Sequence, residues 1–371
     1  MTEAAKKPKR PYSFNVDKGP FHDNGASPWF TPIKLGTDPA LPPMKLNFDT
    51  GARFIWATST ECNTGACTMP GRVRFDPNTS PTFSWIDQNE VMIDFGPWGT
   101  MLAKVGLDQL GAPLPGLGVN FYVTTFYEGT QFAELNWDGG LGIPTGRDPD
   151  PRSSNLIQRM LEASLIDPRE ATISFYTDPT TKTGTISVGQ FDETLVVPES
   201  EIQIPFAPYL AGLEYIWTTP LGYWKVGDVD VAVDKMFCHD SGSSQFKGDV
   251  SIMLSAIDEV NRQLGETGRY PNLSLEFGTD RSGNPGRFTL TSDEYVTLIE
   301  AGEGEGNYTI NINPLAGLDN LVLVGSILMD YVYTIYTWEV SGTWPYYTLG
   351  PGTVRMFNKR NGPQIIQNRA Q

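Results

Sequence analysis

A short acidic motif occurs twice in this chain, at matching places in its two halves. Residues 48–51 are Phe-Asp-Thr-Gly and residues 237–242 are Phe-Cys-His-Asp-Ser-Gly, and each motif follows an apolar segment. The two aspartates, at positions 49 and 240 of 371, are separated by about half of the chain. Later in each half comes an apolar run that contains glycine, at 140–143 and at 323–325. The repeat predicts two similar halves, each with an acidic turn, a long excursion and an apolar strand.

The segments between these motifs are mostly of the β type. Short runs rich in β-branched and aromatic residues are bounded by Gly, Pro, Asp and Asn, which is typical of strands and turns. Helical periodicity is convincing in three places, at 154–163, 250–264 and 291–299. The prediction is therefore an all-β fold with a few short helices. Strands are expected at 44–48, 91–95, 119–126, 171–176, 185–188, 224–226 and 331–338.

Composition excludes several classes of partner. Lysine and arginine number 27 against 43 acidic residues, a formal net charge of −16, and such a surface repels nucleic-acid phosphates and anionic lipid. The longest nearly apolar run, 321–329, is too short to cross a bilayer. Three cysteines and two histidines are too few for an ordinary structural zinc site. We expect no nucleic acid, membrane, metal or cofactor.

The cysteines give one clue about compartment, and the N-terminus gives another. Cys62 and Cys67 lie in a loop of small and polar residues, and their spacing favours a small disulfide over two free thiols. A disulfide favours an oxidising compartment. Cys238 lies in an apolar run and is expected to be a buried free thiol. Residues 1–14 have basic side chains without an apolar stretch, so they are not a secretory signal, and an intracellular location stays open.

Six segments, in the right order, resemble those of the pepsin-like, two-lobed aspartic peptidases. Residues 48–62 resemble the first catalytic turn, its following tryptophan (Trp56) and the small disulfide loop, and residues 238–244 resemble the second catalytic turn. The resemblance extends over roughly 13–357. The remaining four segments are a partner strand (137–144), a helix and strand (155–176), a strand opening the second lobe (222–231) and a closing segment (321–336).

The resemblance implies a bilobal fold with an active-site cleft between the lobes. A flexible tail is expected over 1–12, an N-terminal β lobe with the first aspartate and the flap over 13–195, and a C-terminal β lobe with the second aspartate over 196–371. It also implies a monomer that takes polypeptide substrates and pepstatin-like inhibitors, and a secreted or vacuolar location.

Asp49 and Asp240 are the candidate catalytic pair. Alone, either would be a turn-capping aspartate, the commoner role before glycine. Together, on tight turns held by backbone N–H groups, two facing carboxylates share one proton. The ionised member can take a proton from water while the other donates to the scissile carbonyl oxygen. This predicts an aspartic endopeptidase. The residues expected to support the pair are Thr50, Gly51, Ser241, Gly242 and Ser243.

Two departures from the family pattern bear on activity. Ala52 stands where pepsin-like enzymes usually have a serine that donates toward the first aspartate. Retroviral members of the wider superfamily also have alanine there, so activity is not excluded. Losing a donor raises the pKa of a carboxylate, so a pH optimum less acidic than pepsin's is expected. In the flap, which aligns with residues 91–101 and is the hairpin that closes over the substrate in this family, Phe95 replaces the tyrosine before Gly96. The hydroxyl that would bond to Trp56 is therefore absent. Trp98 offers an indole N–H at the flap tip instead.

A third departure is His239, beside Asp240, where the family prefers an apolar residue. Since alternate residues of a strand point to opposite faces, we expect His239 to point away from the pair as a packing histidine with satisfied nitrogens. Two alternatives to a peptidase stay open. One is a non-proteolytic enzyme that uses the same two carboxylates on a small molecule, which Ala52 and Phe95 favour. The other is a catalytically silent binding protein.

Overall fold

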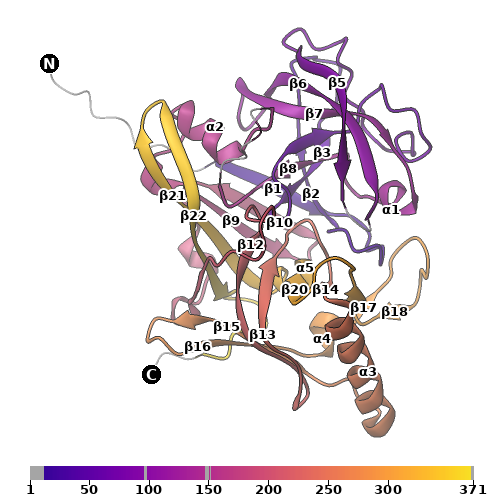
Figure 1. Cartoon of the computed structure of the whole chain (residues 1–371), viewed down its shortest axis with the longest axis vertical. Coiled ribbons are helices and arrows are strands. Elements are labelled where there is room, and N and C mark those ends of the chain that lie inside the picture. The colour runs from indigo at the N-terminus through magenta and orange to yellow at the C-terminus, as the bar shows by residue number, and fades with distance from the viewer. Residues whose placement is uncertain (1–11, 96–97, 147–149, 151, 369–371) are drawn as a thin grey trace, which may run out of the picture.

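Strands dominate the computed structural model, which describes residues 12–368 without 96–97, 147–149 and 151 (Figure 1). The all-β prediction is confirmed, and each predicted strand falls on an observed one. Residues 1–11 of the expected tail lie outside the described part, and its last residue, Tyr12, begins the first strand.

The elements follow one another in chain order. The strands of the first half are β1 (Tyr12–Lys18), β2 (Trp29–Ile33), β3 (Met44–Asp49), β4 (Ile55–Ala57), β5 (Ser84–Asp94), β6 (Thr100–Leu110), β7 (Leu117–Tyr127), β8 (Gly139–Gly142), β9 (Thr172–Asp178) and β10 (Thr183–Val188). Those of the second half are β11 (Ile202–Pro205), β12 (Trp217–Val226), β13 (Val229–His239), β14 (Phe246–Gly248), β15 (Leu273–Asp280), β16 (Pro285–Leu290), β17 (Thr297–Leu298), β18 (Tyr308–Thr309), β19 (Ile312–Pro314), β20 (Leu321–Val324), β21 (Val332–Thr343) and β22 (Tyr346–Asn358). The helices are α1 (Thr130–Ala133), α2 (Leu156–Glu162), α3 (Val250–Thr267), α4 (Ser292–Tyr295) and α5 (Ser326–Met329).

The sequence repeat is also a repeat of topology. In the first half β3 runs parallel to β8, and β4 lies between β8 and β7, antiparallel to one and parallel to the other. In the second half β13 runs parallel to β20, and β14 lies in the same way between β20 and β19. The predicted partner strands are therefore those that flank the two acidic turns. Each aspartate is held at the end of a strand that has neighbours on both sides.

One antiparallel sheet joins the two halves. Its order is β1–β10–β9–β21–β22–β11, so strands from the start, middle and end of the chain lie side by side (Figure 1). Within this sheet the halves meet where β9 pairs with β21, for example Phe175 beside Thr334. Because the sheet is continuous across the halves, it marks no boundary, and the division at residue 195 stays a prediction.

Two of the three predicted helices are correct. Helix α3 begins after Asp249, whose carboxylate accepts from the N–H groups of Ser251 and Ile252, and it ends at the left-handed Gly268. Helix α2 begins after Asn155, which caps it in the same way. The third prediction, 291–299, is wrong beyond its first turn. Thr291 caps α4, but the helix ends at residue 295, and the next residues pair as β17 with β18.

The core of the second half contains His239. Its ring lies edge-on to Phe237 at 4.7 Å and to Phe277 at 5.7 Å between centroids, on the strand face opposite to Cys238 and Asp240. Its expected direction is confirmed. The expectation of satisfied nitrogens is wrong: neither imidazole nitrogen has a hydrogen-bond partner among the described residues. Burial lowers the pKa of His239 from 6.5 to about 3.

Replacing His239 by phenylalanine is expected to make the fold less sensitive to acid. The folded chain keeps the imidazole neutral, whereas the unfolded chain binds a proton below pH 6.5. The contribution of the neutral His239 to the free energy of unfolding is therefore full above pH 6.5 and falls as the pH decreases toward about 3. At pH 5 the loss is about 2 kcal/mol. Urea unfolding at pH 7 and pH 5 should show the wild type losing that much more stability than His239→Phe. Equal losses would contradict the prediction.

Candidate active site

Reciprocal hydrogen bonds tie the two acidic turns together. The N–H of Thr50 donates to the hydroxyl of Ser241 over 3.0 Å, and the N–H of Ser241 donates to the hydroxyl of Thr50 over 2.9 Å. Each hydroxyl then donates to a backbone carbonyl of the opposite half, that of Thr50 to His239 and that of Ser241 to Phe48. Both side chains are buried, so water does not compete for these bonds. The turns are consequently fixed relative to each other.

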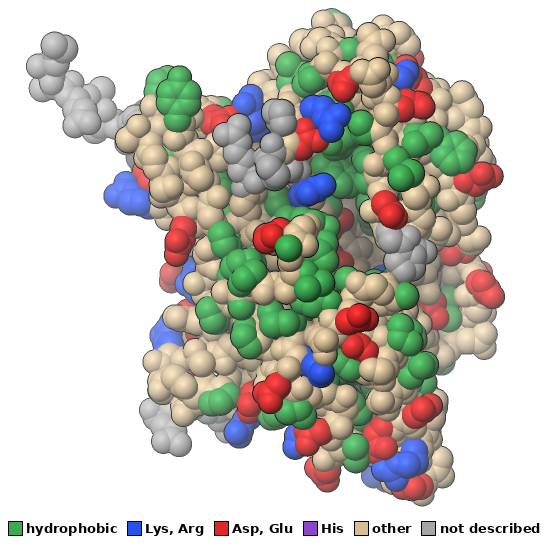
Figure 2. Space-filling model, viewed as in Figure 1, with side chains coloured by type: hydrophobic (Ala, Val, Ile, Leu, Met, Phe, Trp, Pro, Cys, Tyr) green, Lys and Arg blue, Asp and Glu red, His purple; other side chains and the backbone are tan. Residues whose placement is uncertain are grey.

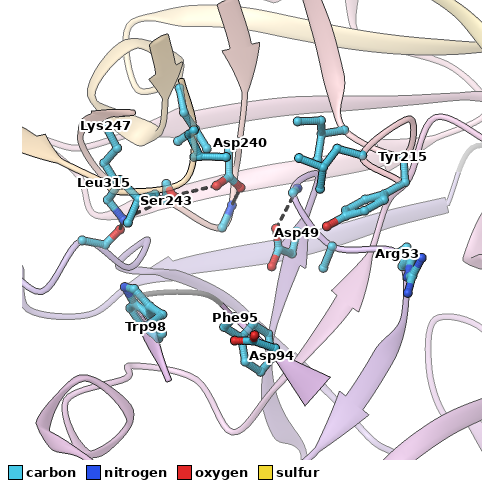
Figure 3. Close-up of a pocket in the computed structure, with 18 of the residues that line it drawn as sticks. Asp49, Arg53, Asp94, Phe95, Trp98, Tyr215, Asp240, Ser243, Lys247 and Leu315 are labelled. Carbon is cyan, nitrogen blue, oxygen red and sulfur yellow. Dashed lines mark hydrogen bonds between the residues drawn. The ribbon is translucent and has the colours of Figure 1, made fainter. Parts of the chain in front are cut away.

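The two carboxylates are held close by their own and each other's glycines (Figure 3). Asp49 accepts from the N–H of Gly51 over 2.8 Å, and Asp240 accepts from the N–H of Gly242 over 2.9 Å. A Cβ atom on Gly51 would lie 2.5 Å from Oδ1 of Asp240, and one on Gly242 would collide in the same way with Oδ1 of Asp49. Any larger residue at either position would therefore push the carboxylates apart.

Burial and mutual repulsion favour a shared proton. Burial, and then the charge of Asp240, raise the pKa of Asp49 well above its usual range, although the N–H of Gly51 favours the charged form. Two carboxylates this close cannot both ionise at ordinary cost. The geometry can therefore supply one proton donor and one proton acceptor at the same place.

The hydroxyl donors are not symmetric. Ser243 donates to Oδ2 of Asp240 over 2.6 Å. The corresponding position in the first turn is Ala52, which has no hydroxyl to offer Asp49. In both turns the N–H of this residue donates to the carbonyl of the aspartate three positions earlier, over 3.3 Å in the first and 3.1 Å in the second. The backbones thus match, and the difference lies in one side-chain oxygen.

A cleft of about 430 Å³ opens over the pair, and both aspartates line it together with Phe95, Trp98 and Trp56. Figure 2 shows a hollow in the middle of this face with hydrophobic side chains along its border. Gly96, expected at the flap tip, lies outside the described residues. On either side of it, Phe95 and Trp98 both pack edge-on against Phe132, at 6.0 Å and 5.7 Å between ring centroids. Phe95 and Trp98 therefore line the cleft on either side of Gly96.

The predicted disulfide is present. Cys62 and Cys67 are bonded and buried, in a cluster that also contains Trp56. Cys238 is a buried free thiol, as expected. Among the described residues, no group of three or more His, Cys, Asp or Glu side chains is placed to hold a metal ion. Within the same part of the chain, no helix has the length and apolar character needed to span a membrane.

Sequence analysis missed two cations that line the cleft. Lys247 is buried on β14, and its ammonium donates to the carbonyl of Gly25 and, over 3.4 Å, to the hydroxyl of Ser243. Arg53 lies on the other side of the pair, its guanidinium 5.4 Å from the ring centroid of Tyr215 (Figure 3). The available clue in the sequence was that Lys247 lies between Phe246 and a glycine. A short strand with such neighbours is expected to be buried, and a buried lysine is rare.

The sequence model described as "Eukaryotic aspartyl protease" matches residues 28–342. The chain belongs to this family. Similar members include cathepsin E of Aquarana catesbeiana, 24% identical over 330 residues that cover 83% of this chain and 76% of the relative. Chymosin of Callithrix jacchus is 24% identical over 72% of this chain and 66% of the relative. The vacuolar aspartic protease of Candida albicans is 23% identical over 83% of this chain and 72% of the relative.

In this member of the family, Ala52→Ser is expected to restore a donor to Asp49. A serine hydroxyl placed as Ser243 is in the other turn would stabilise the charged form of Asp49 and lower its pKa by about one unit. The shift can be followed by ¹³C-NMR titration of labelled aspartate carboxyls, with Asp49→Asn assigning the resonance. Ala66→Ser, the same change at a buried position of the disulfide loop, serves as control. An unchanged titration in Ala52→Ser would show that the missing hydroxyl does not set the pKa.

Proposed function

We propose that this chain is an aspartic endopeptidase that hydrolyses peptide bonds of extended polypeptides in the cleft between its two halves. The observation that carries the proposal is the pair itself: Asp49 and Asp240 lie on matched turns, each carboxylate against the other's glycine, at the floor of an open cleft. Membership of the aspartyl protease family agrees with it.

The chemistry follows from one proton shared between two carboxylates. The ionised carboxylate takes a proton from a water molecule, whose oxygen attacks the carbonyl carbon of the scissile bond. The protonated carboxylate gives its proton to the carbonyl oxygen, so a neutral tetrahedral diol forms without a covalent enzyme adduct. Collapse of the diol breaks the C–N bond as the protonated carboxyl gives its proton to the leaving nitrogen. At the same time the ionised carboxylate takes a proton from one diol hydroxyl, whose oxygen becomes the carbonyl oxygen of the new carboxylic acid. The two carboxyl groups then again hold one proton.

The cleft suits an extended chain. A peptide in strand conformation can hydrogen-bond through its main chain to the flap segment between β5 and β6, while its side chains contact the walls. Phe95, Trp98 and Trp56 supply apolar surface on the flap side, and the segments at 213–216 and 315–318 supply it opposite. Such a site binds the backbone of many sequences, which is what an endopeptidase requires.

Location and oligomeric state are part of the proposal. The bonded Cys62–Cys67 pair supports an oxidising, secreted or vacuolar location. We further propose that the protein acts as a monomer, because both aspartates come from one chain.

The small-molecule alternative rests on two specific residues. Phe95 has no hydroxyl to order the flap, and Ala52 leaves Asp49 without a hydroxyl donor. An enzyme with these changes would still have its two carboxylates for acid–base chemistry. The cleavage experiment separates it from the endopeptidase.

Purified protein should cleave an unfolded protein substrate between about pH 3 and pH 7, at an optimum less acidic than pepsin's, because the pKa of Asp49 is raised. Pepstatin should inhibit the cleavage. Asp49→Asn and Asp240→Asn should each lower kcat/KM on the order of a thousandfold, since each removes one proton partner. Asp228→Asn, at an exposed turn, is the control. Absence of cleavage by folded protein at every pH would sink the endopeptidase proposal and favour the small-molecule enzyme.

A further inference from the structure

Lys247 is a buried cation that the proposed chemistry does not use. It is the middle residue of β14, which lies between β19 and β20, so strand neighbours cover both edges. Phe246, next to it, points to the other face and stacks on Trp224 at 5.1 Å. The lysine side chain is therefore directed to the cleft side, although only 7% of the residue is exposed.

Uncharged groups hold the ammonium of Lys247 in position. It donates to the carbonyl of Gly25 and to the hydroxyl of Ser243. Gly25 has a positive φ of 81°, and a Cβ atom there would lie 2.6 Å from Cε of Lys247. The loop before β2 therefore needs glycine at this position for two reasons: the backbone has a positive φ, and the lysine side chain leaves no space for a Cβ atom. Two fixed acceptors and the close contact with Gly25 keep the side chain in one place.

Ser243 connects this cation to the catalytic pair. Its hydroxyl lies 3.4 Å from Nζ of Lys247 and donates over 2.6 Å to Oδ2 of Asp240 (Figure 3). These two links put the positive charge within about 6 Å of the Asp240 carboxylate, the range over which an opposite charge favours the ionised form. A hydroxyl whose oxygen accepts from a cation is also a stronger donor.

Few other charges act on this lysine. Among the described residues, the titratable groups that act on Lys247 are Asp240 and Asp49, both favouring its charged form. Burial outweighs them and lowers the pKa of Lys247 to about 8, so the ammonium stays charged at acidic and neutral pH. Asp23, on the same loop as Gly25, instead accepts a hydrogen bond from Gln245. The nearby anions that Lys247 can stabilise are thus the pair itself.

We infer that Lys247 is a positioning residue, whose ammonium acts through Ser243 to hold Asp240 as the ionised member of the pair and leave the shared proton on Asp49. The two turns then differ in a consistent direction. Asp240 has a hydroxyl donor backed by a cation, whereas Ala52 offers Asp49 no hydroxyl and the guanidinium of Arg53, on that side, lies over the ring of Tyr215. In the proposed reaction, which gives the pair its catalytic meaning, Asp240 would activate the water and Asp49 would protonate the carbonyl.

The test is a ¹³C-NMR titration of labelled aspartate carboxyls in Lys247→Met, which keeps the length of the side chain and removes its charge. We expect the first ionisation of the pair, assigned to Asp240 through Asp240→Asn, to move up by about one pH unit. Lys359→Met is the matched control: Lys359 is buried too, its pKa is lowered to about 8, and it donates to the carbonyls of Thr177 and Asp330. A shift of less than about 0.3 unit in Lys247→Met, or an equal shift in Lys359→Met, would overturn the inference.

The wild-type protein provides a second measurement that needs no folded variant. As Lys247 loses its proton near pH 8, the Asp240 carboxyl resonance should show a further inflection, larger than that of Asp49. Its absence would also count against the inference. Neither titration depends on turnover. A chain that cleaves nothing would defeat the endopeptidase proposal while the titrations still decide the role of Lys247; if it cleaves, the acidic limb of kcat/KM should move with the titration.

Discussion

Thr50 and Ser241 each donate from the backbone to the other's hydroxyl, and each hydroxyl donates across to the opposite half. Each of the two hydroxyls both accepts and donates, so removing one would leave buried partners unsatisfied in both turns. The position of the carboxylates depends on it, because the aspartates are the preceding residues on the same turns. The two sides of the cleft are fixed relative to each other at this contact.

A symmetric backbone supports an asymmetric pair. The strand pairings around β3 and β13 repeat one another, and the two glycines play the same part on each side. The two carboxylates differ in the side chains around them: Asp240 has Ser243 and, beyond it, Lys247, whereas Asp49 has Ala52 in place of the serine. Proton sharing needs two carboxylates that are close but not equivalent, and here a few atoms outside the repeated framework provide the inequivalence.

Sequence patterns predicted what depends on local spacing. The acidic turns, their partner strands, the small disulfide and the capped helix α3 were all visible because each requires particular residue types within a short stretch. The third helix failed after one turn because pairing of β17 with β18, about ten residues apart, outweighed a helical stripe. Lys247 escaped notice because its partner Gly25 lies in a distant loop. The unsatisfied nitrogens of His239 likewise depend on which rings fill the space around them.

Thr50 and Ser241, which hydrogen-bond to each other across the site, are 191 positions apart. The sheet between the halves is complete only when β21 pairs with β9. Contacts between such distant segments can form only after both segments have been synthesised. A nascent chain that ends before residue 240 has half of the pair and no cleft. The sheet can therefore join the two halves of the site only after β21 (Val332–Thr343) has been synthesised.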